Sequence, residues 1–63
     1  MKPEEAQKLS RGNLVIWKED SMLGMVIEIH PQKGLHILWL NGHDGWLPFY
    51  NAHLVEFGKE GTP

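Results

Sequence analysis

Apolar residues in this chain fall into five short runs, and Gly, Pro, Asn and Asp residues separate the runs. None of them reaches the roughly 10–12 residues expected of a helix, and β-branched and aromatic residues dominate them, which favours strands. The expected strands cover residues 14–17, 25–30, 35–40, 46–47 and 53–57. Five short strands with turn residues between them predict an all-β fold, either a small barrel or a sandwich.

The second and third expected strands form a hairpin whose register depends on its turn. Residues 32–34 fit a three-residue loop in which Gly34 supplies the left-handed conformation. This loop places Ile29 opposite Ile37 on one face and His30 opposite His36 on the other. A four-residue loop would mix polar and apolar side chains on both faces, so the three-residue loop is preferred.

The apolar residues that alternate onto one face form the predicted core, which is Ile27, Ile29, Leu35, Ile37 and Trp39, with Val15, Leu47, Leu54 and Val55 from the flanking strands. The first strand is apolar on both faces. Alternation therefore leaves open whether Val15 and Trp17 or Leu14 and Ile16 point inward.

Polar segments flank this apolar centre and divide the chain into three parts. Residues 1–11 form a polar lead with one central aliphatic side chain, Leu9, and we expect this lead to be frayed. Residues 12–57 form the barrel. Residues 58–63 contain no apolar side chain, and we expect them to form a mobile tail.

The order of strands and turns resembles that of SH3-like small barrels. Residues 48–52 stand where those barrels have a single 3₁₀ turn before the last strand, and Gly24-Met25-Val26 resembles the Gly-x-Val opening of KOW and Tudor-type barrels. Residues 37–42 and 46–48 resemble the second half of the same barrels. The whole is similar to small single-barrel proteins of tailed bacteriophages. The resemblance covers residues 12–57 and implies a five-stranded SH3-like barrel, but small barrels carry many unrelated functions.

Length and charge narrow the function classes. The 63 residues make one small domain, and 6 basic against 8 acidic residues give a net charge of −2, which argues against a phosphate-backbone binder driven by net charge. No cysteine is present to form a disulfide or a cysteine zinc site. The chain contains neither an apolar run of the ~20 residues that a membrane helix needs nor the apolar core of a secretion signal. We therefore expect a cytoplasmic protein, in the host cytoplasm if a phage encodes it.

Catalytic and metal chemistry are not expected. Ser21 lies in a charged loop without the glycine-flanked elbow of a nucleophilic serine, and a barrel this small leaves no pocket of the ~300 Å³ that substrates usually need. His30 and His36 face each other in the predicted hairpin, but zinc requires three or four protein ligands. The sequence thus predicts no enzyme, no cofactor, no metal and no small-molecule substrate.

Aromatic residues near strand ends are the sharpest functional feature. The candidates for partner binding are Trp17, Trp46, Phe49 and Tyr50. Such residues form a cage for methylated lysine or arginine in Tudor-type barrels and line a groove for proline-rich peptide in SH3 domains. They also serve a tiny core, because each buries ~150–250 Å². Cage, groove and core all stay open at this point.

Two function hypotheses follow from these residues. The leading one is a non-enzymatic interaction module, monomeric in isolation, that docks a protein partner through its loop-edge aromatics. The alternative is a nucleic-acid-binding KOW-like barrel that contacts phosphate through Lys33, Lys18 and Arg11.

Overall fold

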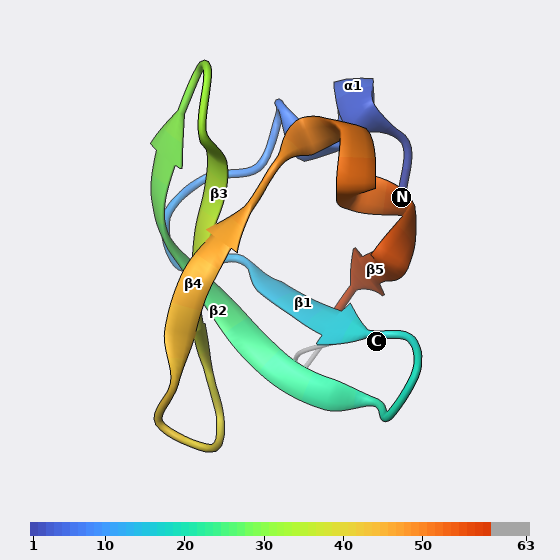
Figure 1. Cartoon of the computed structure of the whole chain (residues 1–63), viewed down its shortest axis with the longest axis vertical. Helices are drawn as coiled ribbons and strands as arrows, with labels where there is room; N and C mark the ends of the chain where they lie inside the picture. Colours follow the sequence, from blue (N-terminus) through green and yellow to red (C-terminus); the bar gives the residue numbers. More distant parts are fainter. Residues whose placement is uncertain (59–63) are drawn as a thin grey trace.

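Five antiparallel strands form one sheet in the order β4-β3-β2-β1-β5 (Figure 1). The structure, a computed structural model, describes residues 1–58. The strands are β1 (Leu14–Trp17), β2 (Met22–His30), β3 (Gly34–Trp39), β4 (Asp44–Leu47) and β5 (Val55–Phe57), preceded by a helical turn α1 (Pro3–Ala6) and with a 3₁₀ helix η1 (Phe49–Leu54) between β4 and β5. The predicted all-β class with five strands is confirmed. The tail expected at 58–63 lies, beyond Gly58, outside the described residues.

Strand β1 turns its second and fourth residues inward. Val15 is fully buried and Trp17 packs against the core, whereas Leu14 pairs with the exposed Met25 on the opposite face. The structure therefore shows which residues of β1 point inward, a question that alternation left open. Leu14 and Ile16 belong to the outer face of the sheet and are half-buried there.

The β2–β3 hairpin has a different register from the predicted one. Its ladder closes at His30 and Gly34, so the three-residue loop is 31–33, one residue earlier than expected. Ile29 pairs with Leu35 rather than with Ile37. The left-handed conformation of Gly34 is confirmed, with φ at 99°.

The predicted faces of this hairpin are nevertheless largely correct. Near the turn the pairing is shifted by two residues, and a shift of two returns every side chain to its own face. The exception is a bulge between Val26 and Glu28, which leaves Ile27 without a partner. Val26 takes the fully buried place predicted for Ile27, which is only half-buried.

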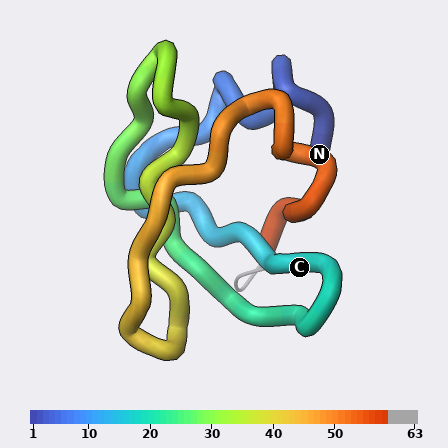
Figure 2. The backbone as a smooth tube through the Cα atoms, viewed as in Figure 1, coloured from blue at the N-terminus to red at the C-terminus, as the bar shows by residue number. Residues whose placement is uncertain are grey.

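The amino-terminal lead is packed rather than frayed, so that expectation is wrong. Ala6 is fully buried and Leu9 nearly so, and α1 lies beside η1 (Figure 2). The amino group of Met1 donates a hydrogen bond to the Val55 carbonyl oxygen at 2.9 Å. Leu9 lies beyond the end of α1, and its amide donates to the Ala6 carbonyl oxygen at 3.2 Å, a tight turn that lets Ala6 and Leu9 cover the core together.

The buried core contains Ala6, Leu9, Val15, Val26, Leu35, Ile37, Leu47, Ala52 and Val55. Ile29 and Trp39 pack against it while partly exposed. Leu54, predicted as core, is half-buried because it ends the 3₁₀ turn. The core therefore takes four unpredicted members from the lead, the bulge and η1, which are Ala6, Leu9, Val26 and Ala52.

Candidate functional site

The outer face of the sheet brings three side chains from three strands into one row. Glu28 of β2 pairs with His36 of β3, and His36 pairs with Trp46 of β4. Neighbouring strands alternate in step, so all three side chains point away from the core. The flanking residues Leu35, Ile37 and Leu47 point inward and are buried, which fixes this orientation.

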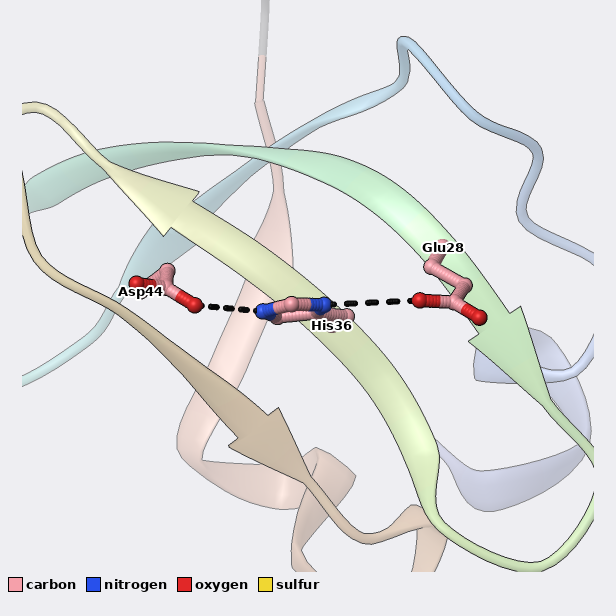
Figure 3. A network of polar contacts seen from close by, with 3 residues as sticks. All are labelled: Glu28, His36 and Asp44. Atoms are coloured by element: carbon pink, nitrogen blue, oxygen red, sulfur yellow. Dashed lines mark hydrogen bonds and ion pairs between the residues drawn. The ribbon is translucent and has the colours of Figure 1, made fainter.

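His36 lies between two carboxylates (Figure 3). Its Nε2 atom is 2.6 Å from Oδ2 of Asp44, and its Nδ1 atom is 3.6 Å from Oε1 of Glu28. The hydrogen bond to Asp44 is the main cause that raises the pKa of His36 above the ordinary 6.5, with Glu28 adding to the shift and partial desolvation opposing it. The arrangement favours the imidazolium form, which donates from both ring nitrogens.

Trp46 lies on this charged imidazole. The two rings stack with centroids 4.6 Å apart and an interplanar angle of 23°. Lys33 places its Nζ atom 5.4 Å from the indole centroid, and His30 meets the indole edge-on at 6.2 Å. Trp46 still exposes 37% of its surface. The indole is thus exposed to solvent and also held in place from several sides.

An aromatic cage for a methylated side chain is not formed at Trp46. Cation–π attraction in such a cage needs a free ring face for the ligand's charge. Here His36 and Lys33 of the same chain already occupy the indole. The geometry presents Trp46 as a fixed aromatic surface rather than as a wall of a cation pocket.

An apolar groove adjoins this row on the outer face. Leu38 pairs with Met25 on one side and with Asp44 on the other, and Leu14 follows beyond Met25. The groove has a volume of about 380 Å³, so the expectation that a barrel this small leaves no hollow of ~300 Å³ is wrong. Its walls are mainly Leu14, Leu23, Met25, Leu38 and Leu40. Leu40, at 76% exposure, is the most exposed of these side chains. Large apolar side chains gathered on a sheet face mark an interaction site more often than scattered ones do.

The four aromatic candidates do not converge on one site. Trp17 turns inward and meets Trp39 edge-to-face, with ring centroids 5.9 Å apart. Phe49 packs half-buried against the core. Tyr50 is 76% exposed on η1, and among residues 1–58 it belongs to no aromatic pair. Only Trp46 lies in the cluster described above.

The two hairpin histidines do not face each other, because the register differs from the predicted one. His30 pairs with Gly34, and its Nδ1 atom accepts hydrogen bonds from the amides of Gln32 and Lys33 at 3.1 Å each. The carboxylates at His36 lie against opposite ring nitrogens, so the three groups cannot ligate one ion together. Within the described part of the chain, no His, Cys, Asp and Glu side chains gather as a metal site.

The basic residues of the nucleic-acid alternative lie on separate elements. Arg11 precedes β1 and Lys18 follows it, so the two flank that strand at opposite ends. Lys33 lies in the β2–β3 turn over Trp46. The structure therefore gathers no basic patch from these three residues.

The sequence did contain a signal for the missed partners of Trp46. Residues 40–42 form a three-residue turn whose last residue, Gly42, has φ at 92°. The preceding hairpin also turns through three residues, 31–33, and Gly34 directly after them has φ at 99°. Applying that loop length to β3 and β4 would have placed Trp46 opposite His36. The apolar row of Met25 and Leu38 depends on the bulge at Ile27, which no residue pattern announces.

No protein-family model, curated protein or solved structure matches this chain. In residues 1–58, no helix is long and apolar enough to span a membrane.

Proposed function

We propose that this chain is a non-enzymatic interaction module that docks a protein partner on the outer face of β2, β3 and β4. The observation that carries the proposal is the exposed indole of Trp46, fixed by its stack on His36 and adjoined by the apolar groove. Exposed tryptophan is enriched among residues that dominate binding energy. An indole already held in place loses little conformational freedom on binding.

The groove supplies the apolar contact area that a single tryptophan lacks. Met25, Leu38 and Leu40 are large apolar side chains exposed on the same face as Trp46. Two carboxylates, Glu28 and Asp44, lie in the same region, with His36 between them and the Lys33 ammonium over Trp46. The partner surface that fits is therefore apolar at its centre, with basic groups at the part of its rim that meets Glu28 and Asp44.

The proposal includes an SH3-like barrel as the scaffold. The strand order β4-β3-β2-β1-β5 and the 3₁₀ helix before β5 support this part of it. The origin in a tailed bacteriophage, as a small accessory protein in the host cytoplasm, rests on the resemblance of the sequence alone. Trp17 and Phe49, which pack on the core, are no longer part of the proposed site.

A capture experiment with matched variants tests the docking face. The immobilised chain is compared with Trp46→Ala and Leu40→Ser, and with Phe57→Ala as a control, because Phe57 is an exposed apolar residue on the distant strand β5. Leu40 and Phe57 are exposed enough that their variants should stay folded, as thermal melting will verify. Any protein captured is then purified and titrated against each variant.

We expect Trp46→Ala and Leu40→Ser to weaken the purified complex by at least about tenfold and Phe57→Ala to leave it unchanged. Tyr50→Ala is a second comparison, since Tyr50 was also a candidate and lies on a different element. Equal affinity of all four variants would show that the outer face is not the docking site. A monomer by sedimentation at several concentrations is expected for the chain alone.

A further inference from the structure

The sheet has two edges, and the chain treats them differently. Strand β5 forms one edge and β4 the other. At the β5 edge, the Val55 amide donates to the Ala52 carbonyl oxygen, and the Val55 carbonyl accepts from the amino group of Met1. The chain's own groups thus satisfy this part of the β5 edge.

The β4 edge has no such cover. Hydrogen-bonded and non-hydrogen-bonded pairs alternate along an antiparallel ladder. The bond from the Trp39 amide to the His43 carbonyl at 2.8 Å sets the phase for β3 and β4. Residues two apart along a strand point their backbone groups to the same side, so Gly45 and Leu47 bond to β3 as His43 does. The amides and carbonyls of Asp44 and Trp46 point outward.

These outward groups have no partner in the described part of the chain. Among residues 1–58, none of the hydrogen bonds made outside the sheet ladders involves the backbone of Asp44 or Trp46. Both residues are exposed. A row of outward amides and carbonyls is a template for another extended chain.

The side chains of β4 define what such an extended chain must look like. On the outer face, Trp46 offers an aromatic surface, and Asp44 offers a carboxylate of which only Oδ2 is bound to His36. On the inner face, a Cβ built at Gly45 meets no atom within 4 Å. An incoming side chain beside Gly45 therefore has open space to enter.

We propose that the β4 edge binds an extended segment of the partner protein by antiparallel strand addition. Read in its own chain direction, the segment carries an apolar residue opposite Trp46, an apolar residue opposite Gly45 and a lysine or arginine opposite Asp44. The basic residue complements the carboxylate, and the middle residue points inward at the open space. This inference rests on the proposed function and names how part of the partner binds.

The test begins with the free protein. Amide hydrogen exchange measured by NMR should be fast at Asp44 and Trp46 and slow at Gly45 and Leu47, because only the latter two bond to β3. Equal protection of all four amides would show that the edge is already covered and would overturn the proposal.

A synthetic peptide then probes the edge. It has eight residues with blocked ends and the central sequence valine-valine-lysine, and its controls carry glutamine or glutamate for lysine or N-methyl groups on the edge-facing amides. We expect the lysine peptide to slow exchange at Asp44 and Trp46 and to bind about two- to fivefold tighter than the glutamine peptide. The N-methylated peptide should give no protection.

Two variants separate charge from fold. Asp44→Asn keeps an acceptor for His36 and should remove the preference for lysine over glutamine, whereas Glu56→Gln on β5 should leave it unchanged. If the lysine peptide leaves the Asp44 and Trp46 amides unchanged up to its solubility limit, or shifts only residues of the apolar groove, strand addition is wrong.

The docking face and the edge can fail independently. A purified partner that loses affinity on Leu40→Ser while the Asp44 and Trp46 amides stay in fast exchange in the complex would retain the docking face and refute strand addition. Peptide binding at β4 without any effect of Leu40→Ser on a partner would retain strand addition and refute the docking face.

Discussion

His36 and Asp44 form a 2.6 Å hydrogen bond between neighbouring strands, although they are not paired in the ladder. His36 is paired with Trp46, and Asp44 with Leu38. The diagonal contact leaves the imidazole free to lie under the indole. One side chain thus connects the carboxylates of β2 and β4 to the exposed tryptophan.

The stability of the domain should depend on pH through His36. Asp44 first, and Glu28 after it, raise the pKa of His36 above 6.5, so the folded chain holds this proton more tightly than the unfolded chain does. The stabilisation is therefore complete below pH 6.5 and is lost as the pH rises through the folded pKa. Urea unfolding measured from pH 6.5 upward through the folded pKa of His36 should show a falling free energy of unfolding.

The variant Asp44→Asn identifies the source of this pH dependence. It should lower the His36 titration midpoint, measured by NMR of the imidazole, and flatten the dependence of stability on pH. Lys33 and His30, which also lie against Trp46, are left unchanged in this comparison so that the other charges around the indole stay the same. A His36 midpoint unaffected by Asp44→Asn would contradict the assignment.

Two glycines with the same backbone conformation should differ in their tolerance of alanine. Gly34 and Gly42 have φ values of 99° and 92°. A Cβ at Gly42 meets nothing within 4 Å, whereas a Cβ at Gly34 would collide with the Leu47 carbonyl. We expect Gly42→Ala to cost about 1 kcal/mol from backbone strain alone and Gly34→Ala at least about 2 kcal/mol more. If the two variants lost equal free energy of unfolding in chemical denaturation, β3 and β4 would have to separate easily beside Gly34.

Hydrophobic alternation predicted faces far better than it predicted partners. Leu35, Ile37 and Trp39 point inward as expected, because their alternation does not depend on which strand lies beside them. The register required the exact loop, and the Gly34 signal allowed the loop to begin one residue earlier. An error of two residues in the pairing leaves every side chain on its predicted face, because side chains alternate with a period of two.

The candidate site was harder to predict than the fold. The sequence makes Trp46 a candidate because it lies near a strand end, but it leaves open whether the indole is exposed or belongs to the core. Its contacts with His36 and Lys33 depend on two registers at once, and the sequence analysis fixed only one of them, incorrectly. The inward rotation of Trp17 was not predictable, since both faces of β1 are apolar.

The packed lead makes its own prediction. Leu9→Ala should destabilise the domain by about 2–3 kcal/mol, because the side chain is almost fully buried and leaves a cavity when shortened. Lys8→Ala, next to it and exposed, should change stability by less than about 0.5 kcal/mol. Similar unfolding free energies for the two variants, measured by urea denaturation, would show that residues 1–11 are frayed, as their polar composition suggests.

Nucleic acid should bind weakly or not at all. Counterion release requires several cationic groups along one phosphate backbone, and Arg11, Lys18 and Lys33 lie on separate elements of a chain with a net charge of −2. Lys33 is also engaged with Trp46. A fluorescence titration with single-stranded RNA and with duplex DNA at low salt checks this, with and without Lys33→Gln. Affinity that falls steeply with added salt and drops on Lys33→Gln would instead favour the nucleic-acid alternative, because only a phosphate contact through Lys33 produces both effects.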